Sequence, residues 1–297
     1  MYLPKNVEII EVGPRDGLQN EANFISTEKK IDLINALNKT GIKRMEATSF
    51  VHPEYVPQMK DAKEVLQGME RKLGLQYMAL IPNEKGYDRA VENGVNAISL
   101  VVGASDSFNL KNVKMTKEES ITKFSSVVEK AKEKGMFIRF NIATAFWCPF
   151  AGKVHPDVVL EIVRRVDSLG VDEIVVCDTI GRANPAQVHD LFELISQGQP
   201  KAMITAHFHD TYGFAQANII AALQVGVTRF DTSIGGLGGC PFAPGAAGNV
   251  ATEDVVCMLH EMGIETGIDL PSLLSCVELV EPLTIRELKG YYHKVKA

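Results

Sequence analysis

The strongest constraint on the fold is a short pattern that recurs along the chain: a glycine, a β-branched residue, two variable residues and an apolar residue. Each copy follows a helix-like stretch and precedes a short apolar run; the copies are Gly41–Met45, Gly94–Ile98, Gly170–Ile174 and Gly226–Phe230. Glycine suits the left-handed turn that closes a helix, and the apolar run is typical of a buried strand. Helix followed by buried strand, several times over, predicts a parallel sheet covered by helices.

The apolar runs can be counted as eight strands, each followed by sequence of helical character. The predicted strands are Val7–Val12, Arg44–Ser49, Leu75–Ile81, Ala97–Val102, Phe137–Ala143, Glu173–Asp178, Met203–His209 and Arg229–Ser233. Helical segments between them include Glu28–Leu37, Lys117–Lys132 and Pro185–Ile195. Eight such units predict an α/β fold, a (β/α)8 TIM barrel with its active site at the carboxyl ends of the strands. The alternative is an open doubly wound sheet, which the lack of a G-x-G-x-x-G after the first strand disfavours.

The domain organisation predicted from the sequence is simple. No linker-like or low-complexity stretch interrupts the chain, and the segments Leu270–Val280 and Ile285–Lys294 have the pattern of two further helices. We therefore expect residues 1–297 to form a single catalytic domain, with residues from about 263 to 297 as a helical C-terminal extension.

Charge and cysteine content restrict the class of partner. The net charge is −6, which argues against binding to nucleic acid or to an anionic membrane surface. No apolar run approaches the roughly 20 residues that cross a bilayer, and the N-terminus has no targeting pattern. The five scattered cysteines contain no C-x-x-C pair. We therefore do not expect a disulfide framework, and we expect a cytoplasmic location.

Polar residues gather where the first two predicted strands end. Arg15 and Asp16 follow the first strand in Gly13-Pro14-Arg15-Asp16-Gly17. Because they are adjacent and follow an apolar strand, we expect their side chains to point in roughly opposite directions and to serve different partners; the alternative is a turn-capping Asp beside a surface Arg. Glu46 ends the second strand and needs a cationic partner inside a barrel, for which Arg15 is the expected choice. Asp178, at the end of the sixth strand, is placed similarly.

The seventh strand ends with two histidines. His207 and His209 stand at positions i and i+2, so both imidazoles project to the same side and can reach one ion, while Phe208 faces the helices. The alternative is a pair of histidines packed in the barrel mouth without an ion, satisfied by other partners.

After the eighth strand, six of the fifteen residues from 235 to 249 are glycine. Such a loop is mobile, or its backbone approaches a ligand closely; the absence of a following Lys-Ser or Lys-Thr disfavours a phosphate loop. Cys240 in this loop is either a reactive thiol or a small apolar filler. Asn249 is either a ligand or the N-cap of the next helix.

A set of oxygen and nitrogen donors emerges from these strand ends: Asp16, His207, His209 and Asn249. Oxygen ligands suit Mg²⁺ or Mn²⁺, and the two imidazoles shift the preference toward Mn²⁺ or another transition ion. A closed structural zinc site would more often use thiolates. The sequence therefore predicts a divalent metal at the mouth of the barrel.

Four segments together resemble the 3-hydroxy-3-methylglutaryl-CoA lyase (hydroxymethylglutaryl-CoA lyase) family, and the similarity extends along essentially the whole chain; they are Gly13–Glu21, Glu46–Phe50, His207–Gly213 and Gly235–Asn249. The wider group of metal-dependent barrels includes isopropylmalate and homocitrate synthases, which share the Arg-Asp-Gly and His-x-His motifs. The cysteine loop and the His-Phe-His-Asp sequence favour the lyases over the synthases. Ile234, Gly235 and Phe242 stand where the lyases more often have Val, Ala and Tyr, which bears on fine substrate preference.

The resemblance implies a carbon–carbon lyase that cleaves the acyl-CoA substrate 3-hydroxy-3-methylglutaryl-CoA to acetyl-CoA and acetoacetate in a metal-assisted retro-Claisen reaction. It implies that Asp16, His207, His209 and Asn249 hold the metal. Arg15 is then the electrophilic, substrate-binding residue, and Cys240 the acid/base; Glu46, Glu253 and Asp178 support them. A homodimer, and a place in leucine degradation or ketone-body formation, are also implied.

Three alternatives and one role stay open. A Claisen-type acyltransferase, a lyase for a related 3-hydroxyacyl-CoA, and a catalytically silent metabolite-binding or scaffold barrel could share the fold. Either Asp16 or His207 could remove the proton of the substrate hydroxyl.

Overall fold

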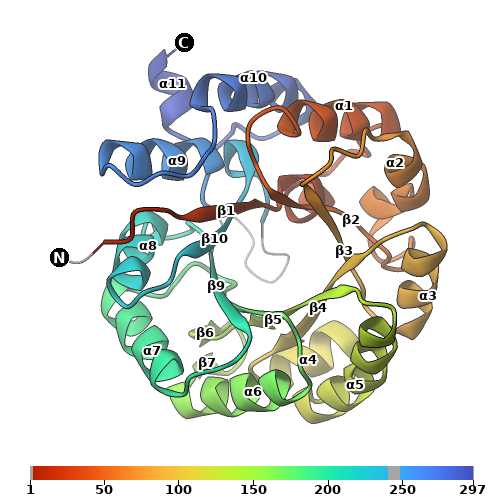
Figure 1. Cartoon of the computed structure of the whole chain (residues 1–297), viewed down its shortest axis with the longest axis vertical. Coiled ribbons are helices and arrows are strands. Elements are labelled where there is room, and N and C mark those ends of the chain that lie inside the picture. Colours follow the sequence, from red (N-terminus) through yellow and green to blue (C-terminus); the bar gives the residue numbers. More distant parts are fainter. Residues whose placement is uncertain (1–2, 240–247, 297) are drawn as a thin grey trace.

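The computed structural model describes residues 3–239 and 248–296 of the chain. Eight parallel strands close into a barrel in the order β1-β10-β9-β8-β5-β4-β3-β2, and β1 pairs with both β10 and β2. Helices form a ring around the barrel (Figure 1). The strands are β1 (Glu8–Glu11), β2 (Arg44–Ser49), β3 (Gln76–Leu80), β4 (Ala97–Gly103), β5 (Phe137–Ala143), β8 (Glu173–Asp178), β9 (Met203–Phe208) and β10 (Arg229–Thr232). The predicted (β/α)8 barrel is confirmed, with strand ends within two residues of those expected.

The surrounding helices begin and end where local chemistry places them. They are α1 (Thr27–Leu37), α2 (Ala62–Gly68), α3 (Glu84–Glu92), α4 (Asp106–Val113), α5 (Lys117–Glu133), α6 (Pro156–Ser168), α7 (Pro185–Gln197), α8 (Ala215–Gln224) and α9 (Thr252–Glu261). Helices α5 and α7 start with capping boxes at Thr116 and Asn184, which satisfy the first free backbone N–H groups. All four glycines of the recurring pattern have positive φ; the values are 98° at Gly41, 69° at Gly94, 76° at Gly170 and 90° at Gly226. Glycine tolerates this conformation without steric cost.

A small antiparallel hairpin follows β5 and was not expected from the sequence. It consists of β6 (Trp147–Cys148) and β7 (Gly152–Lys153). Strands of two residues carry too little periodic pattern to be recognised in sequence, and their pairing depends on a turn with Gly152 at φ 77°.

The C-terminal extension confirms one predicted helix and corrects the other. Helix α10 (Leu270–Val280) has the expected bounds, but α11 runs from Tyr292 to Lys296, so the predicted helix Ile285–Lys294 is wrong. Backbone N–H groups before α11 are engaged in tertiary contacts instead. Lys289 N–H donates to the Gly235 carbonyl over 3.1 Å, and Tyr291 N–H donates to the Asp254 carboxylate over 2.9 Å. This segment therefore packs against the loop that follows β10.

The interior of the protein contains both apolar clusters and buried charged side chains. The main apolar core includes residues from the strands and the helices around them, whereas a small separate cluster is formed by Ile10, Val12, Met78 and Ala97. Many other buried strand residues are charged: Arg139 is 1% exposed and Glu173 0%. Barrel interiors are usually filled by branched apolar residues, so the charges need a specific explanation.

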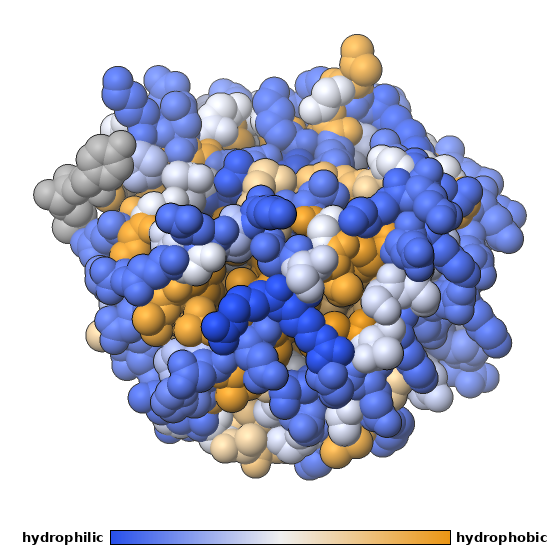
Figure 2. Space-filling model, turned by 60° about the horizontal axis from the view of Figure 1, so that its bottom comes forward, coloured by the Kyte–Doolittle hydropathy of each residue, from blue (hydrophilic) through white to orange (hydrophobic). Residues whose placement is uncertain are grey.

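The outer surface differs from this interior. The face drawn in Figure 2 is predominantly hydrophilic, with apolar side chains visible mainly in hollows between polar ones. Among the helices of the described residues, none combines the length and apolar content required of a membrane span.

Candidate active site

The chain coils immediately after β1. Residues Gly13–Gly17 form a single π-helical turn, in which the N–H groups of Arg15 and Asp16 both donate to the Val12 carbonyl. As a result Arg15 Nη1 lies 2.7 Å from Asp16 Oδ1. The expectation that these two side chains diverge is wrong, because it assumed extended backbone. The turn instead brings a cation and a carboxylate together at the barrel mouth.

Arg15 is held from its other side by Glu46, as expected. The Nε and Nη2 atoms of Arg15 both contact Glu46 Oε2, and the Glu46 side chain is only 1% exposed. Burial opposes the positive charge of Arg15, but the charges of Glu46 and Asp16 outweigh burial and raise its pKa. The guanidinium is therefore a fixed cation in a partly desolvated position, where electrostatic interactions are stronger than in water.

Asp16 meets the two histidines of β9. One ligand atom from each of Asp16, His207 and His209 lies within 4.8 Å of the others. Burial alone would raise the pKa of Asp16, but Arg15, the two histidines and the hydrogen bond from Asn249 together outweigh burial, and the pKa falls to about 2. Burial, followed by the neighbouring His207, lowers the pKa of His209 to about 4. An ionised carboxylate and a neutral imidazole are the forms that bind metal.

Asn249 joins this cluster from the far end of the glycine-rich segment. Its Nδ2 donates to Asp16 Oδ2 over 2.8 Å and to the Leu237 carbonyl over 3.0 Å. The N-cap of α9 is Ala251, so the interpretation of Asn249 as the helix cap is wrong. Gly238 lies so close that a Cβ there would stand 2.7 Å from Asn249 Nδ2. This close approach accounts for glycine at position 238.

Two buried polar atoms in the cluster have no hydrogen-bond partner among the described residues: His209 Nδ1 and Asn249 Oδ1. A buried polar atom left unpaired costs about 1–3 kcal/mol, so such atoms usually indicate a bound ion, water or ligand. The carboxylate and the amide oxygen suit Mg²⁺ or Mn²⁺, the two imidazoles favour Mn²⁺ or another transition ion, and a structural zinc site would more often use thiolates. The residues fit a divalent cation.

The residue between the histidines faces away from this cluster, as predicted. The Phe208 ring lies 6.5 Å from the rings of both Phe146 and Phe192, and Phe192 belongs to α7. Phe208 is 1% exposed. This packing fixes the end of β9 and hence the direction of both imidazoles.

The other two predicted supporting carboxylates contact loop backbone. Asp178 accepts from the N–H groups of Arg182 (3.1 Å) and Ala183 (2.8 Å), so the expectation of a cationic partner for it is wrong; burial raises its pKa to about 6. Glu253 accepts from Gly235 N–H over 3.0 Å. Asp178 thus holds the loop after β8 and Glu253 the loop after β10.

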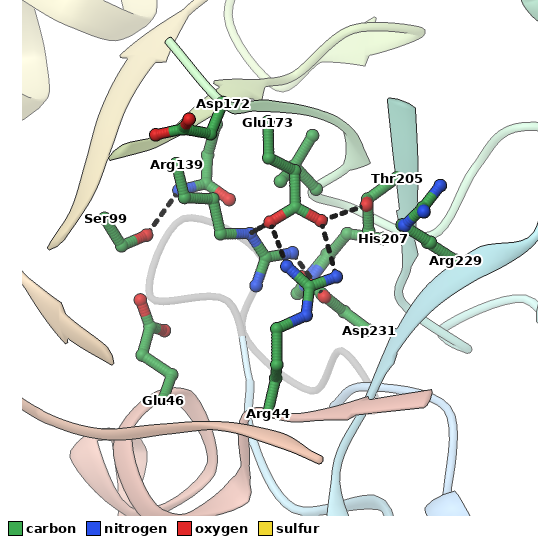
Figure 3. A network of polar contacts seen from close by, with 12 residues as sticks. Arg44, Glu46, Ser99, Arg139, Asp172, Glu173, Thr205, His207, Arg229 and Asp231 are labelled. Carbon is green, nitrogen blue, oxygen red and sulfur yellow. Dashed lines mark hydrogen bonds and ion pairs between the residues drawn. The ribbon is translucent and has the colours of Figure 1, made fainter. Parts of the chain in front are cut away.

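The residues beneath His207 were not predicted from the sequence. His207 Nδ1 lies 3.0 Å from Asp231 Oδ2, and Arg139 contacts the other Asp231 oxygen. Deeper still, Arg44 pairs with Glu173 (Figure 3). Charged residues inside otherwise apolar strands were the available indication, since such residues are rarely buried unless paired. Cys240, the predicted acid/base, lies outside the described residues.

Fold and site define a (β/α)8-barrel protein with a cluster suited to a divalent metal at the carboxyl ends of its strands. The model of the HMGL-like family matches residues 6–280, and the chain belongs to this family. The resemblance to hydroxymethylglutaryl-CoA lyases is confirmed by its relatives. Hydroxymethylglutaryl-CoA lyase YngG of Bacillus subtilis is 44% identical over 296 residues, which is 98% of this chain and 99% of that protein. The mitochondrial enzyme of Homo sapiens is 45% identical over 272 residues, 92% of this chain and 84% of that protein.

Solved structures agree with the sequence relatives. The HMG-CoA lyase of Bacillus subtilis superposes with a TM-score of 0.97 at 43% identity, covering 100% of this chain and 99% of that one. An HMG-CoA lyase from Acinetobacter baumannii, in complex with coenzyme A and 3-methylmalate, gives a TM-score of 0.92 at 43% identity, covering 98% and 95%. The carboxyl transferase domain of Rhizobium etli pyruvate carboxylase, at 17% identity and a TM-score of 0.72, shares the fold alone.

Proposed function

We propose that this chain is a hydroxymethylglutaryl-CoA lyase that cleaves 3-hydroxy-3-methylglutaryl-CoA to acetyl-CoA and acetoacetate in a retro-Claisen reaction. The observation that carries the proposal is the cluster of Asp16, His207 and His209 beside the fixed cation Arg15. It occurs in a barrel 44% identical, over nearly its whole length, to a lyase named for this reaction. The substrate's hydroxyl proton is lost, the bond between C2 and C3 breaks, and the acetyl-CoA carbanion takes up a proton.

The proposed ligands are Asp16, His207, His209 and Asn249, which would hold Mg²⁺ or Mn²⁺. When bound, such an ion lowers the pKa of a hydroxyl group and stabilises negative charge on oxygen. The unpaired His209 Nδ1 and Asn249 Oδ1 support this ligand set. Asn249 also connects the loop after β10 to Asp16 through its hydrogen bond.

Arg15 is proposed to meet the enolate oxygen of the departing acetyl-CoA. One such contact to a developing negative charge lowers the activation barrier by about 3–4 kcal/mol. Glu46 orients Arg15 through two nitrogen contacts, which leaves the rest of the guanidinium for Asp16 and the substrate. Cys240 is proposed to protonate the carbanion as a general acid. Asp178 and Glu253 are proposed to support the site through the loops they hold.

Further properties are proposed from the sequence pattern and from the family resemblance. We expect one catalytic domain over residues 1–297, a homodimer, a cytoplasmic location, and a role in leucine degradation or ketone-body formation. Relatives carry both locations in their names: one in Mus musculus is called cytoplasmic and the one in Homo sapiens mitochondrial.

The experiment that tests the function is incubation of the purified protein with 3-hydroxy-3-methylglutaryl-CoA and Mg²⁺ or Mn²⁺, with detection of acetoacetate and acetyl-CoA in equal amounts. A parallel reaction with acetyl-CoA and 2-oxo acids, followed by release of free CoA, tests the Claisen-type synthase. A third reaction with 3-hydroxyacyl-CoA esters that differ at C3 tests the related lyase. Turnover confined to either parallel reaction, or turnover in none, would overturn the proposal.

A further inference from the structure

Beneath the proposed metal ligands, His207 makes one side-chain contact that decides which of its nitrogens is free. His207 on β9 and Asp231 on β10 are directly paired in the register of adjacent strands. His207 Nδ1 lies 3.0 Å from Asp231 Oδ2, and the Asp231 side chain is 3% exposed. Figure 3 shows the imidazole and the carboxylate facing one another inside the barrel.

Arg139 on β5 holds the carboxylate of Asp231 from the opposite side. Its Nη2 contacts Asp231 Oδ1, so the two carboxylate oxygens serve two different partners. Arg139 is 1% exposed and has Glu173 3.4 Å away as its second anion. An aspartate beside a fixed guanidinium is ionised and can only accept hydrogen bonds. His207 therefore carries a hydrogen on Nδ1, so Nε2 is the nitrogen whose lone pair can be offered to a metal.

The charges continue below Arg139 in alternating sign. Glu173 pairs with Arg44 over 2.8 Å, and Arg44 pairs with Glu8 over 2.8 Å. Glu8 is half-buried and also lies 3.3 Å from Arg229. Because each buried charge has an opposite neighbour, neither Arg139 nor Asp231 can turn away without leaving another charge unpaired, which is costly in a protein interior. The column thus limits the freedom of Asp231.

We propose that Asp231 is a positioning residue for the metal site: it fixes the tautomer and ring orientation of His207, and Arg139 acts behind it by dictating which way the Asp231 side chain faces. The inference rests on the metal-binding part of the proposed function. A purely structural role for the same contacts would affect the stability of the barrel and leave the His207 tautomer and metal affinity unchanged.

The most direct test needs no variant. Long-range ¹⁵N NMR of the metal-free protein distinguishes imidazoles protonated on Nδ1 from those protonated on Nε2. The chain has seven histidines, and the resonances of His207 are those absent from the spectrum of His207→Gln. We expect the Nδ1–H form for His207. Observation of the Nε2–H form would overturn the inference whatever the variants below do.

The variant Asp231→Asn sharpens the test because it preserves shape. Arg139 can only donate, so the new amide oxygen should turn to Arg139 and the amide NH₂ to His207. His207 Nδ1 must then accept, which moves the proton to Nε2 and blocks that nitrogen. Loss of such a supporting contact lowers metal affinity about 10- to 100-fold. Titration with Mn²⁺ alone, followed by electron paramagnetic resonance, measures this directly.

A second substitution should reverse part of the loss. In Asp231→Asn combined with Arg139→Met, no guanidinium donates to the amide oxygen of the new asparagine. This oxygen can therefore accept from His207 Nδ1, and the lone pair of Nε2 is again available to a metal. We expect Mn²⁺ affinity several-fold above that of Asp231→Asn alone, with the Nδ1–H form restored in the NMR spectrum. Affinity no better than in the single variant would overturn the role given to Arg139.

Asp254→Asn is the matched control, because Asp254 is a buried carboxylate that accepts from the backbone N–H groups of Tyr291 and Tyr292. It should lower thermal stability and leave Mn²⁺ affinity unchanged. Wild-type Mn²⁺ affinity in Asp231→Asn would overturn this inference while leaving the metal site intact. If the wild-type protein itself bound no Mn²⁺ saturably, the metal site would be wrong and this inference with it.

Discussion

The two ends of the barrel interior both contain paired charges, but the upper end also holds buried polar atoms that are available to a ligand. At the lower end Arg44, Arg139 and Glu173 are paired among themselves and with Asp231. At the upper end, buried polar atoms of His209 and Asn249 have no partner among the described residues. The difference separates polar groups that hold the barrel together from polar groups kept available for a ligand.

The energetic logic of the two ends differs accordingly. Buried charges are tolerated when each has an opposite partner in good geometry, and removing one partner is strongly destabilising. An unpaired buried polar atom has no such compensation within the protein, so its cost is offset only when something binds. We therefore expect substitutions at the upper end, and at Asp231 and Arg139 which support it, to weaken metal binding or turnover, and substitutions deeper in the lower end to reduce stability.

The largest effect is expected from removing a proposed ligand. In His207→Ala or Asp16→Ala, one donor is lost from a set of four, so Mn²⁺ affinity should fall more than about 100-fold and turnover should be lost. Elemental analysis of the purified variants measures bound metal, and circular dichroism confirms that the barrel is folded. Full metal content in either folded variant would contradict the ligand assignment.

Cys240→Ser should have the next largest effect. A hydroxyl is a far weaker acid than a thiol at neutral pH, so loss of general acid catalysis should lower kcat about 10²- to 10⁴-fold. Metal content should be unchanged. Steady-state kinetics measures the effect, and a near-normal kcat would end the acid/base role of Cys240.

Alkylation compares Cys240 with thiols whose surroundings are known. Burial raises the pKa of Cys276 to about 12 and that of Cys177 well above its usual range, so both should react slowly with iodoacetamide. Cys257 is half-buried. We expect inactivation with the label mapped chiefly to Cys240, and protection by a substrate analogue. Inactivation that tracked another cysteine would argue against the proposal.

Arg15→Lys should reduce turnover by a somewhat smaller factor. Lysine keeps the charge but not the planar fork, so it cannot hold Glu46 and an enolate oxygen together. Loss of one such electrostatic contact should lower kcat about 10²- to 10³-fold, with metal binding near normal. The fall should be in kcat because the enolate charge exists only as the bond breaks. An unchanged kcat with a raised KM would make Arg15 a binding residue only.

The smallest effect on turnover is expected at the lower end, from Arg44→Met. The substitution removes one partner of Glu173, which keeps Arg139 and Thr205. We expect the free energy of unfolding to fall by about 3 kcal/mol while kcat and Mn²⁺ affinity stay close to those of the wild type. Denaturant unfolding measures the free energy of unfolding, the lyase assay measures kcat, and titration with Mn²⁺ measures the affinity. If the variant had full stability but low turnover, the proposed difference in role between the two ends would be wrong.

Most of the fold was predictable because its helices and strands follow local sequence patterns. Glycine at helix ends and apolar runs repeat with each unit, and the structure places Gly41, Gly94, Gly170 and Gly226 in the conformation the pattern demands. The last helix was misplaced because the N–H groups of Tyr291 and Tyr292 are held by Asp254, 37 and 38 residues away in the chain. Such contacts leave no periodic trace in the sequence.

The site was predictable where residues share a strand or neighbouring strands. His207 and His209 are two positions apart, and Glu46 meets Arg15 as expected. The pairing of Arg15 with Asp16 was not foreseen, since it depends on a π-helical turn with no clear sequence pattern. Asp231 was missed although it lies opposite His207 on the neighbouring strand, because a single acidic residue in a short strand does not reveal its partner. Arg139 was missed because only the closed barrel brings it to Asp231, 92 residues away in the chain.

The measurement that tests the central claim most directly is metal dependence of the cleavage itself. The protein is stripped with a chelator, and acetoacetate formation from 3-hydroxy-3-methylglutaryl-CoA is followed before and after stepwise addition of Mn²⁺. We predict negligible turnover in the stripped protein, full recovery as the upper site fills, and an end point at one ion per chain. Turnover that survives complete removal of metal, or that recovers equally in His207→Ala, would contradict the account.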